Sequence, residues 1–210
     1  MRIFLSRPTW IAPQYQPGVD TFLTQLENLG LDARTIGVSD YPTKSPLDEV
    51  IDILQTCRGA IVLGVPQLKI QQGFLKGDVI TKPLVLGTEW NHLEAGLAYS
   101  AGLPLLVIHH YTLTRGIFDR GVLNAFLHSV DLESSNWSMQ PNLNGAIVHW
   151  KEDCTQQSGN RVSAHAQAPS GKPFCPNCSS SRPIYLRPIP PDFISIENAS
   201  WECSQCGYKE

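Results

Sequence analysis

The chain has 210 residues, of which 42% are hydrophobic and 17% are charged, and its formal net charge is −3. This length suits one ordinary domain with a small appendage, or two small domains. The weak negative charge gives no general attraction to nucleic acid or to anionic lipid. Because no apolar run approaches the roughly 20 residues that cross a bilayer, and no signal peptide precedes the first strand-like run, we expect a cytoplasmic protein without a membrane segment.

Strand-like and helix-like segments alternate along the first 110 residues. Continuous apolar runs are typical of parallel strands that are buried on both faces. The predicted strands span residues 2–6, 31–36, 60–63, 84–86 and 105–108. Strands that alternate with helices in this way predict an α/β fold with a doubly wound, five-stranded parallel sheet.

The predicted helices occupy the intervals between these strands. Phe22, Leu26 and Leu29 recur at helical spacing, and Gly30 follows where a glycine commonly ends a helix. Ser45 and Pro46 predict the start of a second helix, because serine caps helices and proline suits the first helical position. Residues 64–82 predict a long loop or a short irregular helix. Beyond the last strand, residues 122–130 predict a further helix.

The composition becomes polar from Asp131 onward, interrupted by an apolar run at 146–150 that predicts either an edge strand or the end of the domain. We therefore expect a nucleotide-binding domain at 1–150, a linker at 151–172 and a small C-terminal module at 173–210.

Two Cys-x-x-Cys pairs stand in the C-terminal module. Each pair allows two thiolates of one tight turn to bind the same ion, and two pairs complete a tetrahedron. The predicted ligands are Cys175, Cys178, Cys203 and Cys206. This spacing resembles a zinc ribbon and predicts one structural zinc as the cofactor; iron of the rubredoxin type and a redox dithiol remain alternatives.

The charges of this module bear on what it contacts. Residues 172–210 contain four Lys or Arg and four Asp or Glu. Nucleic-acid binding usually requires a basic surface, so nucleic acid is an unlikely partner, and a structural or protein-contacting role is favoured.

Residues 83–110 contain the candidate catalytic groups. Glu89 and Glu94 follow a predicted strand and lie early in a predicted helix, and ligands of open α/β sheets bind beyond the carboxyl ends of the strands. Trp90 lies four residues before Glu94, so the two share a helix face. Glu89 is expected to cap the helix or face solvent. Glu94 also fits an ordinary first-turn acid, and Trp90 fits a packing residue.

The run Glu94-Ala95-Gly96-Leu97-Ala98 after a Gly-Thr turn resembles the nucleoside 2-deoxyribosyltransferases, and the spacing of Trp90 and Glu94 is similar to that in TIR domains. Both resemblances imply a flavodoxin-like architecture and a glutamate that acts on a ribosyl C–N bond. They imply that Glu94 is catalytic, that NAD is the favoured substrate, and that bacterial defence or nucleotide signalling is the setting.

Breaking a ribosyl C–N bond gives an oxocarbenium-like centre, which one carboxylate can stabilise, trap or attack through water. Groups near the strand ends are placed to bind the ribose and phosphates. These expected substrate-binding residues are Ser6, Arg7, Gly64, Trp90, Asp119 and Arg120.

A second hypothesis is a nucleotide-sensing module that binds without cleaving and contacts a partner protein through the zinc ribbon. It is favoured because the transferases carry an aspartate after the third strand, where this chain has residues 63–66 (LGVP). Self-association is a further expectation.

Overall fold

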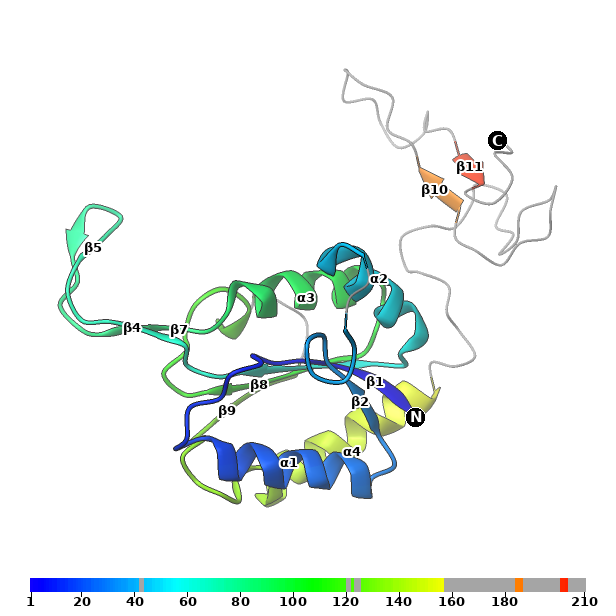
Figure 1. Ribbon diagram of the computed structural model, residues 1–210, viewed down its shortest axis with the longest axis horizontal. Helices are drawn as coiled ribbons and strands as arrows, with labels where there is room; N and C mark the ends of the chain where they lie inside the picture. Colours follow the sequence, from blue (N-terminus) through cyan, green and yellow to red (C-terminus); the bar gives the residue numbers. More distant parts are fainter. Residues whose placement is uncertain (42–43, 120–121, 123–125, 157–183, 187–200, 204–210) are drawn as a thin grey trace. The chain divides into compact units, whose positions relative to one another are not determined.

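The computed structural model describes residues 1–41, 44–119, 122, 126–156, 184–186 and 201–203. Within the unit Met1–Ser158, a five-stranded parallel sheet has the strand order β2-β1-β3-β8-β9 (Figure 1). Its strands are β1 (Arg2–Ser6), β2 (Asp32–Arg34), β3 (Ala60–Gly64), β8 (Leu105–His110) and β9 (Phe126–Val130). This confirms the predicted α/β class and the five-stranded parallel sheet.

Helices cover both faces of the sheet (Figure 1). They are α1 (Gln16–Asn28), α2 (Pro46–Thr56), α3 (Glu89–Ser100) and α4 (Pro141–Gln156). Strand side chains alternate between faces: Ile3 and Leu5 pack with apolar residues of α1 and α4, whereas Phe4 packs with those of α2 and α3. The continuous apolar runs therefore supply two hydrophobic cores.

The helix signals of the sequence correspond to observed ends. Ser45 caps α2, its hydroxyl accepting a hydrogen bond from the Asp48 N–H at 3.3 Å, and Pro46 is the first helical residue. Helix α1 ends just before Gly30, which has φ of +70°, a backbone conformation that glycine adopts at little cost.

Two sheet predictions are wrong. Residues 84–86 form β7 (Leu84–Leu86), which pairs antiparallel with β4 (Leu68–Ile70) outside the main sheet. Strand β3 pairs directly with β8 from Ala60↔Leu105 onward, so no strand fits between them. The fifth strand is β9 (Figure 1), although the sequence predicted a helix at 122–130. Residues 126–130 pair instead with the edge of β8, with Leu106 opposite Phe126, so that this edge is not left unpaired.

The segment between β3 and α3 forms a protruding β-ribbon, which we call the arm (residues 67–86). It contains the β4–β7 pair and, beyond it, β5 (Phe74–Leu75) paired with β6 (Asp78–Val79). Figure 1 shows the arm extending away from the layered domain. The sequence predicted only a loop or an irregular helix here.

The apolar run at 146–150 belongs to α4, which continues to Gln156 into the residues expected to begin the linker. In the second unit, Gly159–Glu210, β10 (Ile184–Leu186) pairs antiparallel with β11 (Trp201–Cys203). Along the described part of the chain, no helix has the length and apolar character needed to cross a membrane.

Candidate active site

Helix α3 begins at the carboxyl edge of the sheet, because it precedes β8 and runs back across parallel strands. Thr88 caps it: the Thr88 hydroxyl accepts a hydrogen bond from the Asn91 N–H at 3.2 Å. Strand order reverses between β1 and β3, the position at which open α/β sheets bind ligands. The first turns of α3 therefore lie over the ends of these two strands.

Glu94 is buried there, with 8% of its surface exposed. Burial raises the pKa of the Glu94 carboxyl from 4.5 to about 7, and the Ser6 side chain acts in the opposite direction by hydrogen bonding to it. No Lys, Arg or His within the described residues forms an ion pair with Glu94. The carboxyl is consequently half-ionised near neutral pH.

Asn91 joins α3 to the end of β1. Its Nδ2 donates a hydrogen bond to the Ser6 Oγ at 2.8 Å, and both residues are almost completely buried. The Ser6 oxygen accepts this bond, so its O–H is directed toward Glu94. The Asn91 Oδ1 is buried and has no hydrogen-bond partner within the described part of the chain. The three side chains form a polar cluster within apolar surroundings.

Phe118 forms a wall of the site. It belongs to the 3₁₀ helix η1 (Gly116–Phe118), and its ring lies so close to Gly64 that a Cβ there would approach two ring carbons at 2.5 and 2.6 Å. The ring centroid is also 5.4 Å from those of His92 and His109. Gly64 therefore gives room for Phe118, in addition to ending β3.

The two histidines beside Phe118 add no positive charge. His92 Nδ1 accepts a hydrogen bond from the Ile117 N–H at 3.4 Å, and burial lowers the pKa of His92 and of His109. Both imidazoles are therefore neutral near pH 7. The polar partner of Glu94 among the described residues is thus Ser6, which in turn accepts a hydrogen bond from Asn91.

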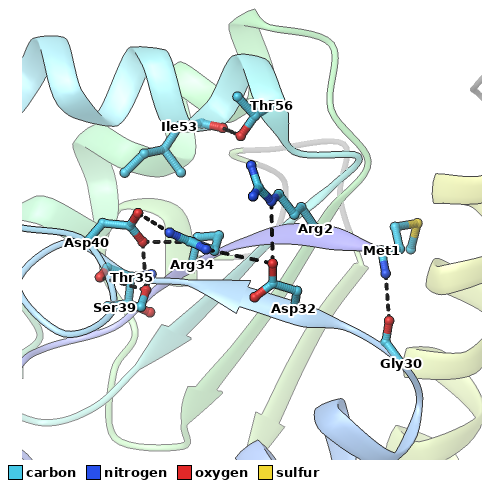
Figure 2. A network of polar contacts seen from close by, with 10 residues as sticks. All are labelled: Met1, Arg2, Gly30, Asp32, Arg34, Thr35, Ser39, Asp40, Ile53 and Thr56. Atoms are coloured by element: carbon cyan, nitrogen blue, oxygen red, sulfur yellow. Dashed lines mark hydrogen bonds and ion pairs between the residues drawn. The ribbon is translucent and has the colours of Figure 1, made fainter.

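A second polar region lies along β2 (Figure 2). This cleft of about 220 Å³ is lined in part by Arg2, Arg34 and Asp40. Its arginines already have carboxylate partners: Arg2 lies 3.4 Å from Asp32, and Arg34 makes two hydrogen bonds to Asp40. Arg34 holds the pKa of Asp40 below its usual value. We interpret this network as support for the short edge strand β2.

The predicted substrate-binding residues differ in position. Arg7 follows Ser6 directly; its Nε is buried with no hydrogen-bond partner in the residues that the structure describes, and burial lowers its pKa. Trp90 lies one turn before Glu94 on α3 with 43% of its surface exposed. Asp119 is exposed at the end of η1, and Arg120 lies outside the described residues.

Sequence reasoning did not select Asn91 or Phe118. Asn91 lies three residues before Glu94, a spacing that places both on one helix face, so this signal was available. Phe118 lies in a loop far from Gly64 in the sequence, and only the folded chain brings the two together.

The predicted zinc ligands Cys175, Cys178 and Cys206 lie outside the described residues. Cys203 ends β11, opposite Ile184 of β10, and nothing is described of its side chain. Among the residues that are described, no group of three or more His, Cys, Asp or Glu is placed to hold a metal ion. Zinc therefore stays a prediction.

Comparison with known proteins gives no family. No family model matches the sequence, and no curated protein matches it. A solved structure that matches is the CMP N-glycosidase BcmB of Clostridium botulinum, with 13% identity and a TM-score of 0.44, over 71% of this chain and 99% of that chain. A match this distant assigns neither a family nor an activity.

Proposed function

We propose that the N-terminal unit cleaves the N-glycosidic bond of a nucleotide, with NAD as the favoured substrate and Glu94 as the essential carboxylate. The observation that carries this proposal is the environment of Glu94. It is a buried acid without a cationic partner among the described residues, at the strand-order reversal of an open α/β sheet, and burial raises its pKa to about 7. Strongly shifted acids in such places are typical of active sites.

The chemistry uses the ionised form of Glu94. Departure of the base leaves positive charge on the ribose, and a carboxylate in an apolar setting stabilises that charge more strongly than one in water. Nicotinamide leaves readily, so no strong general acid is required. The Ser6 O–H, held by Asn91, orients the carboxylate and favours its ionised form. We expect kcat/KM to rise with pH through about 7.

The proposal also assigns groups that bind the substrate. The half-exposed ring of Trp90 offers a stacking surface for a base, and the Arg7 guanidinium, whose Nε has no hydrogen-bond partner among the described residues, suits a phosphate. Asp119 and Arg120 are proposed to bind ribose hydroxyls and a phosphate, respectively.

The test is to incubate the full chain with NAD and a panel of nucleosides and nucleotides, and to quantify free base by chromatography. Glu94→Gln should reduce release at least about 100-fold, because the replacement keeps the shape and removes the charge. Glu89→Gln, which changes an exposed acid on the same helix, is the matched control and should retain activity. Release by Glu94→Gln at the wild-type rate would refute the proposed mechanism.

A non-catalytic nucleotide sensor is the alternative. It is favoured by the end of β3, where Leu63 and Val65 are fully buried and no second carboxylate is available. Nucleotide binding measured by equilibrium dialysis, equal in wild type and Glu94→Gln and without base release, would support the sensor over the enzyme.

We further propose that residues 173–210 bind one structural zinc through Cys175, Cys178, Cys203 and Cys206. A segment this short builds little core, so metal binding would supply much of its folding free energy. Metal analysis of the same preparation should find about one zinc per chain; a folded, zinc-free protein would refute the assignment. A role in bacterial defence is proposed only as the setting of this activity.

A further inference from the structure

The arm is a two-stranded ribbon with an ordered tip. The tip turn places Lys76 at φ of +54° and Gly77 at φ of +92°, both left-handed, as the tight turns of β-hairpins require. Beyond the β4–β7 pair the ribbon continues as β5 and β6, closed by a hydrogen bond from the Ile80 N–H to the Gly73 carbonyl at 2.8 Å. Isolated two-stranded ribbons are marginally stable in water, so an additional contact is expected to stabilise the arm.

Large apolar side chains of the arm face solvent. Phe74 is 76% exposed and Val79 64% exposed, and the two are directly opposite each other across β5 and β6. Directly opposed side chains lie on one face of a ribbon, so together they form one apolar surface. Leu68 on β4 is also 53% exposed. A cluster of this kind on a protruding element is typical of a surface that another protein covers.

The arm is basic, whereas the chain as a whole is acidic. Residues 68–82 contain Lys69, Lys76 and Lys82 against Asp78 alone, which gives a net charge of +2. The partner surface should therefore combine apolar side chains with negative charge.

The outer face of α2 combines exposed apolar side chains with negative charge. Leu47 and Ile51 are 40% and 36% exposed, and their spacing of four residues places them on one face. Asp48 and Asp52 form a parallel acidic row, in which Asp52 also pairs with Lys44 of the same chain. Residues 44–56 contain Lys44 against Asp48, Glu49 and Asp52, which gives a net charge of −2.

We propose that the arm of one copy docks onto α2 of a second copy, and that the second arm docks reciprocally onto the first. Figure 1 shows the arm leaving the end of the domain remote from α2, so one chain cannot bring its own arm onto its own α2. Two identical contacts related by a two-fold axis close the assembly as a dimer. The Phe74–Val79 pair packs on Leu47 and Ile51, and the arm lysines face the acidic row.

The test is the mass of the full chain by light scattering and sedimentation. Wild type should have twice the 23.2 kDa chain mass. Phe74→Glu with Val79→Glu should give monomers, because two like-charged groups would then face the acidic row. Val148→Glu, which changes an apolar residue on α4 that is 37% exposed, is the control outside the arm and should remain dimeric.

Charge reversal separates a docking contact from damage to the arm. Lys69→Glu with Lys76→Glu should give monomers, and adding Asp48→Lys with Asp52→Lys should restore the dimer. If the wild-type particle at its highest soluble concentration had the mass of one chain, 23.2 kDa, the proposal would be overturned. An oligomer that survives the arm substitutions, or a charge reversal that the second pair fails to rescue, would also overturn it.

Discussion

The Glu94 carboxyl binds its proton more tightly in the folded protein than in the unfolded chain. Its pKa is about 7 in the folded protein, against 4.5 for the free side chain. Between these two pH values the folded state binds the proton more tightly than the unfolded chain does. Stability is therefore greatest below about pH 4.5 with respect to this group, and decreases as pH rises through about 7. Above that, the ionised carboxylate destabilises the fold by up to about 3 kcal/mol.

Glu94→Gln should remove this pH dependence. We expect the variant to gain up to about 3 kcal/mol in free energy of unfolding relative to wild type between pH 5 and pH 8, because glutamine carries no charge to bury. Urea unfolding at the two pH values measures it. Glu89→Gln, the exposed control, should show no comparable gain, and a Glu94→Gln difference that is constant with pH would contradict the assignment.

At the scale of elements, the site depends on the contact between η1 and the end of β3. The Phe118 ring packs on Gly64 because glycine has no Cβ, and His109 Cβ would lie 2.9 Å from a Cβ added at Gly64. This contact brings the loop after β8 against the first turns of α3, where His92 also meets the Phe118 ring. The wall beside the first turns of α3 is therefore built by packing between elements distant in the sequence.

Gly64→Ala should destabilise the protein by about 1–3 kcal/mol, since the added methyl overlaps the Phe118 ring. In Phe118→Leu, which shortens that ring, the cost of Gly64→Ala should be smaller, so the two substitutions should be non-additive. Thermal or urea unfolding of the four proteins measures the coupling.

Gly96→Ala is the matched control, because a Cβ at this helical glycine meets nothing within 4 Å. It should stabilise α3 by up to about 1 kcal/mol. If Gly64→Ala lowered the free energy of unfolding equally in wild type and in Phe118→Leu, the Phe118 ring would not be what restricts residue 64 to glycine.

For the whole molecule, the sequence predicted the parts that depend on local patterns. Continuous apolar runs identified β1, β3 and β8, and the Ser45-Pro46 signal identified the start of α2. Glu94 could be selected because its position after a strand and at the start of a helix is local. The arm, β9 and the Phe118 wall could not be predicted, because each depends on which distant segment offers a pairing edge or a packing partner. Residues 84–86 have the same apolar character as a core strand, yet they pair in the arm.

Glu94 is a buried carboxyl with no ion-pair partner among the described residues, and its pKa lies near neutral pH. The most direct measurement is an NMR titration of the ¹³C-labelled glutamate carboxyl carbons, in which the Glu94 signal is assigned by its absence from Glu94→Gln. We expect a titration midpoint near 7 for this signal. A midpoint near the ordinary value of 4.5 would contradict it.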